Sequence, residues 1–253
     1  MADDGKELSG RAAIVTGSGR NIGRAIALAL AAGGAGVVVN ARSNRNEAAT
    51  VAGEVERAGG KAVIVLGDVA DPNTAAAMAE AALDRFGRID FLVNNAAVRA
   101  EEPVETLSYA AWRAVMDVVL DGAFHCVQAC LPALKGSGAG AIVNIGGLSA
   151  HTGSQRRIHV VAAKAGLVGL TRALAHDLAA DGITVNCVSP GLIGTPRPAG
   201  APEPAHHAIH RTLTGERGTP DEVAAVVRFL CGPGARYVTG QTIHANGGAY
   251  LGG

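Results

Sequence analysis

The chain has 253 residues, of which 48% are hydrophobic and 17% charged, so it can bury a sizeable core and is not a disordered chain. Lysine plus arginine and aspartate plus glutamate number 22 each, and this balance argues against a general nucleic-acid or acidic-membrane binder. The N-terminus lacks a signal-peptide pattern, and no uninterrupted apolar run is long enough for a membrane span.

Short apolar runs rich in β-branched residues alternate with longer, alanine-rich segments of helical period. The runs predict buried parallel strands at 12–16, 36–40, 62–66, 90–94, 141–145 and 183–188. The longer segments predict helices over 22–32, 46–58, 73–86, 111–134 and 158–180. Asp71 and Asn73 are N-cap candidates for the third helix. This order predicts a doubly wound α/β sheet with right-handed crossovers, and without a linker we expect one domain over residues 1–253.

One irregular segment, at about 192–215, is dense in proline and glycine and follows a strand end, where open α/β sheets bind ligands. We expect it to form a loop and a short helix that act as a substrate lid. His206 and His210 within it are spaced like a metal pair, but no cysteine completes a site, so we favour substrate contact or solvated surface and no metal.

The four cysteines contain no CxxC pair. Two of them, Cys126 and Cys130, share a helical face, yet buried thiols are the more frequent use of such residues. The other two are Cys187 and Cys231, and this use of cysteine predicts a reducing cytoplasm as the location.

A glycine turn, "IVTGSGRNIGRAIA", joins the first strand to the first helix. Gly17 can adopt the dihedrals of the turn, and Gly23 lets the helix pack close to the strand. The helix N-terminus then offers unpaired N–H groups to a pyrophosphate. Such a turn within a βαβ repeat predicts a dinucleotide site.

The turn resembles the TGxxxGxG motif of the short-chain dehydrogenase/reductase family, with Asn21 in place of the middle glycine. Asparagine tolerates left-handed backbone, so we expect the turn to survive. "GDVAD" (67–71), "NNAA" (94–97) and "SPGLIGT" (189–195) resemble further family motifs, in order, within a match over about residues 9–248. In the last of these motifs the resemblance implies that Thr195 contacts the nicotinamide amide.

The resemblance implies a Rossmann-type domain with a seven-stranded parallel sheet flanked by helices. It also implies a homotetramer or homodimer in which the helices at 111–134 and 158–180 pack between subunits. Together with the cations of the second strand end discussed below, the predicted cofactor-binding residues are Gly17, Ser18, Arg20, Asn21, Ile22, Gly23, Arg42, Asp68, Val69, Asn95, Ala96, Lys164, Pro190, Gly191, Ile193 and Thr195.

Charge at the end of the second strand bears on the choice of nicotinamide cofactor. An acid there would bind the ribose 2′-OH of NAD, whereas a 2′-phosphate needs cations. Ala41 stands at the acid position, Arg42 follows it and Arg20 lies in the glycine loop. We therefore favour NADP(H) over NAD(H), although both arginines could be plain surface charges.

The family's catalytic pattern combines a tyrosine, a lysine four residues later, a serine and an asparagine. Lys164 is present, but the resemblance places Val160 at the tyrosine position, Gly147 at the serine position and Val119 at the asparagine position. A carbonyl oxygen that gains charge needs donors, which these three residues do not offer. The usual proton chemistry therefore cannot run here.

Nearby side chains are candidate replacements for the missing donors. His159 adjoins Val160 but should point about 100° away on a helix. Ser149 and His151 follow Gly147, with local capping or turn bonding as the simpler role, and Lys164 itself could be the acid if burial lowers its pKa.

Two neighbouring arginines precede the vacant tyrosine position. Arg156 and Arg157 could clamp a substrate carboxylate or phosphate, or lie in a solvated loop.

Three functions are compatible with this pattern, and no nucleic-acid or membrane partner is expected. The first is an NADP(H)-dependent oxidoreductase acting on a small carbonyl or alcohol with an atypical, tyrosine-less site. The second is a catalytically degenerate nucleotide-binding or partner subunit, and the third is a non-redox lyase or isomerase in the same pocket. Retained cofactor motifs favour the first.

Overall fold

The computed structural model describes residues 5–195 and 211–252. Its seven strands form one sheet in the order β3-β2-β1-β4-β5-β6-β7, and every neighbouring pair is parallel. The strands are β1 (Ala12–Val15), β2 (Gly36–Ala41), β3 (Lys61–Leu66), β4 (Phe91–Asn94), β5 (Ala141–Ile145), β6 (Thr184–Pro190) and β7 (Thr242–Ala245). The expected seven-stranded parallel sheet is confirmed.

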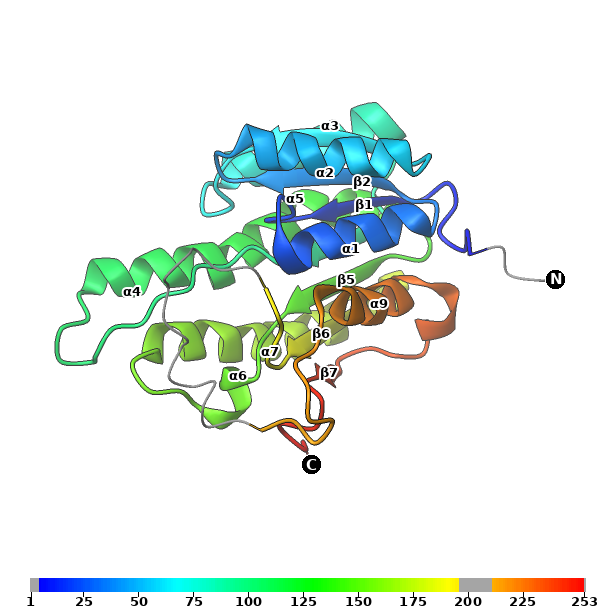
Figure 1. The fold of residues 1–253 in the computed structure, drawn as a ribbon. Helices are drawn as coiled ribbons and strands as arrows, with labels where there is room; N and C mark the ends of the chain where they lie inside the picture. Colours follow the sequence, from blue (N-terminus) through cyan, green and yellow to red (C-terminus); the bar gives the residue numbers. More distant parts are fainter. Residues whose placement is uncertain (1–4, 196–210, 253) are drawn as a thin grey trace.

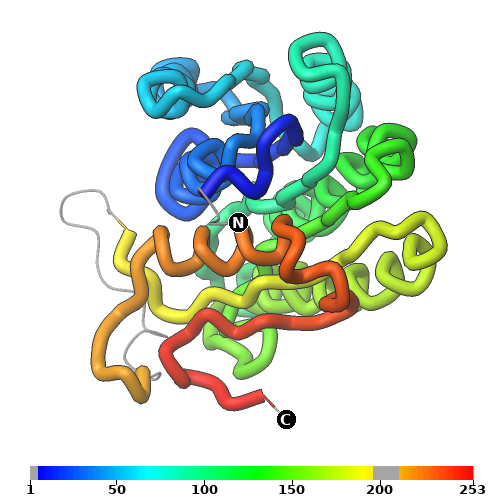
Figure 2. Tube along the Cα trace, turned by 90° about the vertical axis from the view of Figure 1, so that its right-hand side faces the viewer, coloured from blue at the N-terminus to red at the C-terminus, as the bar shows by residue number. Residues whose placement is uncertain are grey.

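Helices cover both faces of the sheet. They are α1 (Asn21–Ala32), α2 (Arg45–Arg57), α3 (Pro72–Phe86), α4 (Tyr109–Met116), α5 (Gly122–Gly136), α6 (Ser149–Thr152), α7 (Ile158–Leu178) and α9 (Pro220–Cys231), with 3₁₀ turns at Ala179–Asp181 and Pro233–Ala235. One buried cluster joins the sheet to α1, α2 and α9, and a second joins its other face to α3, α5 and α7. Figure 1 shows α1 and α9 in front of the sheet, and Figure 2 shows β7 beside β6 near the C-terminus.

Strand order explains where a ligand site can form. The chain runs outward from β1 through β2 to β3, and then returns to place β4 on the other side of β1. In such a sheet a crevice opens outside the carboxyl ends of the strands where this direction reverses. The loops after β1 and β4 therefore define the position to search.

The segment predicted as one helix over 111–134 is interrupted. A π-helical turn, Asp117–Asp121, separates α4 from α5, and it contains Val119. The Arg113 guanidinium bonds to the carboxylates of Asp117 and Asp121, one at each end of this turn. Hydrogen bonds in a π turn span five residues, one more than in an α-helix. The periodicity of an α-helix therefore did not reveal this turn.

Capping of α3 separates the two predicted candidates. Asp71 is the N-cap, and its carboxylate accepts the backbone N–H of Asn73 at 2.9 Å. Asn73 lies inside the helix after Pro72, so its prediction as a cap was wrong. Proline at the first helical position fixes the start one residue earlier.

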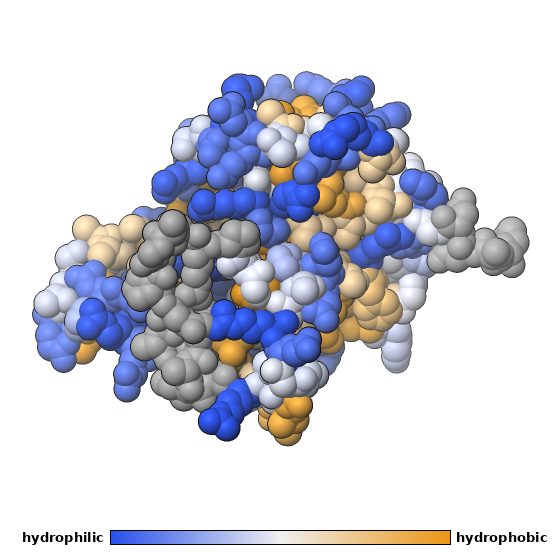
Figure 3. Space-filling model, in the orientation of Figure 1, coloured by the Kyte–Doolittle hydropathy of each residue, from blue (hydrophilic) through white to orange (hydrophobic). Residues whose placement is uncertain are grey.

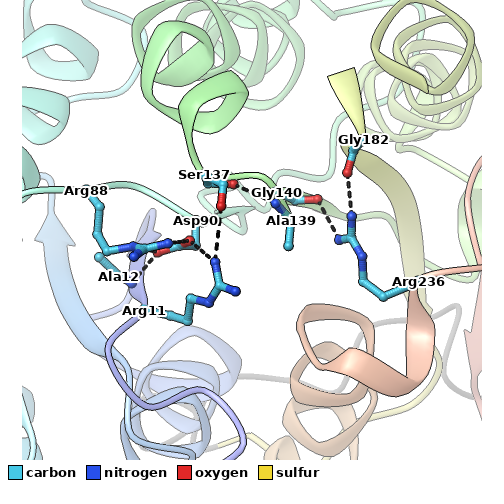
Figure 4. A network of polar contacts seen from close by, with 9 residues as sticks. All are labelled: Arg11, Ala12, Arg88, Asp90, Ser137, Ala139, Gly140, Gly182 and Arg236. Carbon is cyan, nitrogen blue, oxygen red and sulfur yellow. Dashed lines mark hydrogen bonds and ion pairs between the residues drawn. The ribbon is translucent and has the colours of Figure 1, made fainter. Parts of the chain in front are cut away.

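A polar network fastens the amino-end edge of the sheet, away from the strand ends that form the crevice. Arg11 and Arg88 donate to the buried carboxylate of Asp90 at 2.8 and 2.6 Å, and Asp90 also accepts the N–H of Ala12 at 2.9 Å (Figure 4). Removing Asp90 would leave two arginines without this shared partner, so we assign this network a structural role.

Two helical segments, Tyr109–Gly136 and Ile158–Asp181, are long and apolar enough to cross a membrane by length and composition. Buried core helices meet the same test, and both segments here pack against the sheet and its neighbours. These two helices are therefore weak evidence for a membrane span.

On the face seen in Figure 3, hydrophilic residues predominate around the α2 side, and apolar residues show along the seam between α1 and α9.

Most of the predicted lid, including His206 and His210, lies outside the described residues.

Candidate active site

A cavity of about 1030 Å³ runs along the carboxyl ends of six strands. This volume is at the upper limit of the ~300–1,000 Å³ typical of small-molecule sites, as a dinucleotide plus a substrate would need. Fifteen of the sixteen predicted cofactor residues line it. The exception is Ser18, which is fully buried and bonds through its N–H and hydroxyl to Asn40.

The cofactor end of the cavity is built on the glycine turn after β1. Gly17 has φ +60° and Asn21 has φ +50°, so asparagine does adopt the left-handed backbone expected of it. A Cβ on Gly23 would lie 2.4 Å from the carbonyl oxygen of Gly17 and 2.5 Å from Nδ2 of Asn95. This contact leaves no room for any other residue, so position 23 requires glycine.

Two side chains hold this turn in place. Thr16 Oγ1 accepts the N–H groups of Asn95 and Ala96, each at 2.9 Å, and Asn95 Nδ2 donates to the carbonyl oxygens of Thr16 and Gly17 at 2.9 and 3.1 Å. The polar groups that shape the cradle are thus bonded to one another across β1 and β4. Asn95, assigned by the resemblance to the cofactor, also has this structural role.

Asn40, at the end of β2, was missed by the sequence analysis. Its Oδ1 accepts the N–H of Gly17 at 3.0 Å, and its Nδ2 donates to the carbonyl oxygens of Val65 and Gly67, each at 3.2 Å. A buried amide that ends the apolar run "VVVN" was the available signal, because buried amides need partners.

The cations predicted to read the cofactor's phosphate lie at the mouth of this end. Ala41, Arg42 and Arg20 all line the cavity, and both arginines are exposed. Arg20 lies 3.9 Å from a carboxylate oxygen of Glu47, which also lines the cavity. Arg42 is the cation next to Ala41, which stands at the position expected for the acid of an NAD-binding site.

The opposite end is formed by the loops after β4, β5 and β6 and by the first turns of α7. We call it the reactive end, because the resemblance places the tyrosine, serine and lysine positions there. Gly147 lines it, and a Cβ at that position would meet nothing within 4 Å. Val160 and Lys164, one helical turn apart on α7, line it as well. Among the described lining residues there is no tyrosine, histidine or cysteine.

Hydrocarbon packs where the resemblance places two of the missing catalytic groups. Val119 and Val160 belong to one buried cluster formed by α4, α5, α7 and the π turn; its other buried members are Val115, Ala123, Ala163 and Leu167. Val119 is 2% exposed and does not line the cavity. Val160 therefore brings hydrocarbon to the cavity surface, and Val119 is buried in the same cluster.

Lys164 is the ionisable group at the centre of the reactive end. Its Nζ donates to the carbonyl oxygen of Ile145, the last residue of β5. Burial lowers the pKa of Lys164 to about 8; nearby Cys187 opposes the shift, while Arg99 and Arg157 add to it. A lysine with this pKa can exchange a proton near neutral pH.

The replacement candidates occupy different places. Ser149, in α6, lines the cavity. His151 packs against His244 and Tyr250, with ring centroids 4.6 and 5.3 Å away, and is not among the lining residues. His159 is 1% exposed, lies in the first turn of α7 and is likewise absent from the lining; burial lowers its pKa.

The two arginines before Val160 differ in burial and in whether they line the cavity. Arg156 is exposed with φ +58°, whereas Arg157 is buried, stands at the N-cap position of α7 and lines the cavity. Arg99, which the sequence analysis did not single out, lines the same end.

The four cysteines are all free and buried, as expected for Cys126 and Cys130. Burial raises the pKa of Cys126 to about 12 and that of Cys187 to about 11. These thiols are packed core groups.

Comparison with known proteins identifies the family. Residues 17–250 match the family model described as enoyl-(acyl carrier protein) reductase. A 3-oxoacyl-[acyl-carrier-protein] reductase FabG of Staphylococcus aureus is 36% identical over 242 residues, which cover 95% of this chain and 98% of the relative. The chain belongs to the short-chain dehydrogenase/reductase family. It is thus related to oxidoreductases over nearly its whole length.

Further members of the family are similar to this chain in sequence and in fold. A 3-oxoacyl-[acyl-carrier-protein] reductase of Synechocystis is 38% identical over 245 residues, covering 96% of this chain and 98% of the relative. A short-chain dehydrogenase from Burkholderia cenocepacia, solved in complex with NADP, superposes with a TM-score of 0.89 at 35% identity, covering 96% and 99% of the two chains. A dehydrogenase/reductase from Sinorhizobium meliloti gives 0.91 at 35% identity, covering 98% of both. The family's Rossmann-type fold is therefore shared in full.

Proposed function

We propose that the chain is an NADP(H)-dependent oxidoreductase that acts on a carbonyl or alcohol substrate with a tyrosine-less active site. One observation carries the proposal: a dinucleotide cradle with its glycine turn in place opens directly onto a cavity end that holds the buried Lys164. The reductase names of the relatives and the NADP-bound neighbour support the same class of reaction.

The residues at the cofactor end fit the nicotinamide dinucleotide. Gly23 keeps the turn open for close backbone approach, and the N-terminus of α1 faces the cavity with its unpaired N–H groups. Arg42 and Arg20 would hold a 2′-phosphate, and Ala41 removes the carboxylate that would repel it. When bound, this cofactor supplies or accepts the hydride.

Lys164 is the proposed acid in the direction of carbonyl reduction. A carbonyl carbon that gains a hydride leaves negative charge on its oxygen, which takes a proton from the Nζ ammonium; solvent then restores that proton. With a pKa of about 8, Lys164 is mostly protonated at pH 7 yet a better acid than an exposed lysine. Ser149 lines the same end, and its hydroxyl would donate a hydrogen bond to that oxygen.

The first test is calorimetric titration with NADPH and NADH, followed by single-turnover oxidation of NADPH with a panel of carbonyl compounds. We expect tighter binding of NADPH and slow but measurable hydride transfer. If Lys164 supplies the proton, the single-turnover rate falls as pH rises above about 8.

One variant separates the two candidate acids, Lys164 and His159. His159→Gln should leave both rate and pH profile unchanged if Lys164 is the donor, and should abolish the pH dependence if His159 is. A failure to bind either nucleotide would reject the proposed enzyme altogether.

The apolar cluster around Val119 and Val160 favours a second candidate, a protein that binds the cofactor but transfers no hydride. Such a protein would be a partner subunit or a non-redox lyase or isomerase. A wall of packed valine offers no donor and is what loss of the proton machinery would leave. Tight NADPH binding without any oxidation by the carbonyl panel would select this second candidate.

Two properties of the whole protein complete the proposal. A homotetramer or homodimer would cover the exposed Phe124 of α5 and Ile158 of α7, which are 47% and 40% exposed. Light scattering coupled to size-exclusion chromatography should report two or four copies, and a monomer would contradict this. We also place the protein in the cytoplasm, where buried free thiols stay reduced.

A further inference from the structure

Two arginines on separate loops meet the reactive end of the cavity. Arg99 follows β4 by five residues, and Arg157 is the N-cap residue of α7. Both line the cavity, together with Val160 and Lys164. Arg157 is only 9% exposed, so its guanidinium is held inside the protein.

The loops that carry these arginines are fastened to each other and to the cofactor end. The N–H of Glu102 donates to the carbonyl oxygen of Arg156 at 2.7 Å, which ties the loop after β4 to the loop before α7. Arg99 Nη1 lies 3.5 Å from Oγ1 of Thr195, the residue that the family resemblance assigns to the nicotinamide amide. The arginines therefore border the place where substrate must meet the nicotinamide.

Cations outnumber carboxylates among the described residues that line this end. Among the described lining residues of the reactive end, three cations, Arg99, Arg157 and Lys164, stand beside one carboxylate, Glu101. Burial lowers the pKa of Arg157, Glu101 raises it and Arg99 lowers it, so the two arginines repel each other electrostatically. An anion placed between them would relieve this repulsion.

We propose that Arg99 and Arg157 bind a compact oxyanion, a carboxylate or phosphate, carried by the substrate next to its reacting carbonyl. Guanidinium is planar and matches both anions with paired N–H donors, and its charge survives burial. The substrate class is then a small oxo acid or oxo phosphate. This inference rests on the proposed function for the reaction itself, but binding can be measured without it.

The site also explains how a pocket without tyrosine can orient a carbonyl. An anionic group fixed by two arginines positions the neighbouring carbonyl against Lys164, and the same cations stabilise negative charge on its oxygen. An uncharged 3-oxoacyl group, as in the names of the relatives, would not gain this anchor.

Matched probes test the anion directly. Calorimetry would compare acetoacetate with methyl acetoacetate, and hydroxyacetone phosphate with hydroxyacetone, all against the protein saturated with NADP⁺. We expect at least one anion to bind about tenfold or more tightly than its uncharged partner, because a hydrogen-bonded charge pair is lost in the partner. The stronger pair identifies carboxylate or phosphate as the source.

Variants assign the effect to residues. Arg157→Gln and Arg99→Gln should each weaken the preferred anion about tenfold and leave the uncharged partner and NADPH unchanged. Arg156→Gln is the control, because that arginine is adjacent in sequence, exposed and outside the lining.

Three results would overturn the assignment. The first is equal affinity for charged and uncharged probes, and the second is an equal loss in Arg156→Gln. The third is weakened NADPH binding in the Arg99 and Arg157 variants, which would assign them to the cofactor. Anion binding without NADPH oxidation would instead reject the proposed redox reaction and retain the site.

Discussion

The two ends of the cavity are built on opposite principles. At the cofactor end, side-chain amides and a threonine hydroxyl bond to backbone groups of the loops after β1 and β4, and Gly23 has contacts that no other residue could satisfy. At the reactive end, valines pack against each other and Gly147 faces open space. A close-packed polar cradle can change little without losing its ligand, whereas a substrate pocket can exchange its chemical groups while the fold stays intact.

The largest expected effect comes from restoring proton donors at the reactive end, which would give that end the polar groups that it lacks. Val160→Tyr with Gly147→Ser and Val119→Asn should raise single-turnover carbonyl reduction by about 10²–10⁴, the usual contribution of a positioned acid. Gly147 has space for the added hydroxymethyl group, since a Cβ there meets no atom within 4 Å. The measurement is NADPH oxidation with a carbonyl panel.

Val119→Asn alone is the control for that experiment, because it adds a polar group to the buried cluster without a donor in the cavity. A triple variant that folds, binds NADPH and still reduces nothing would show that the reactive end was shaped for another reaction.

The cofactor end should respond in the opposite way, with loss on the smallest change. Gly23→Ala places a methyl group 2.4 Å from the Gly17 carbonyl oxygen, so we expect NADPH affinity to fall about a hundredfold and stability to fall by about 1–3 kcal/mol. Calorimetry and urea unfolding measure the two effects.

Gly53→Ala, within α2, is the matched control, since its Cβ would meet nothing within 4 Å. That change should raise stability by about 0.4–1 kcal/mol. Equal behaviour of the two variants would contradict the tight contact at Gly23.

Cofactor preference should shift with one cation. Arg42→Gln should weaken NADPH about tenfold and leave NADH unchanged, because only the 2′-phosphate would lose a charged hydrogen bond. The control is Arg45→Gln, at the start of α2 and outside the described lining. Parallel weakening of both nucleotides would place Arg42 elsewhere on the cofactor.

The smallest predicted effect is the pH dependence of stability that Lys164 causes. Its folded pKa of about 8 lies below the 10.5 of an unperturbed lysine, so the unfolded chain binds more protons and stability rises with pH between these values. From pH 7 to 9 we expect the free energy of unfolding to gain about 1 kcal/mol from this group.

Lys164→Met should remove that gain, and urea unfolding of both proteins at pH 7, 8 and 9 measures it. An identical pH dependence in the variant would show that the lysine is not buried as a cation.

Local signals in the sequence predicted much of the cofactor end. Strand positions followed from apolar runs, because strands of a covered parallel sheet are buried on both faces. Asp71 was recognised as a cap and Asn21 as a left-handed residue, since both depend on a few neighbouring atoms. Asn40 was missed because its partners, Gly17, Val65 and Gly67, come from other strands.

At the reactive end the sequence determined composition but not arrangement. It named Val160, Gly147 and Val119 as residues without donors, which the chain alone establishes once the family pattern is laid over it. It did not distinguish Arg156 from Arg157, one exposed and the other buried in the cavity wall. Nor did it place Arg99, because proximity between the loops after β4 and before α7 exists only in the folded sheet.

The lowered pKa of Lys164 and the π turn at Val119 likewise required the tertiary structure. Sequence fixes which groups are available, but burial and long-range neighbours decide the charge, direction and reach of each one.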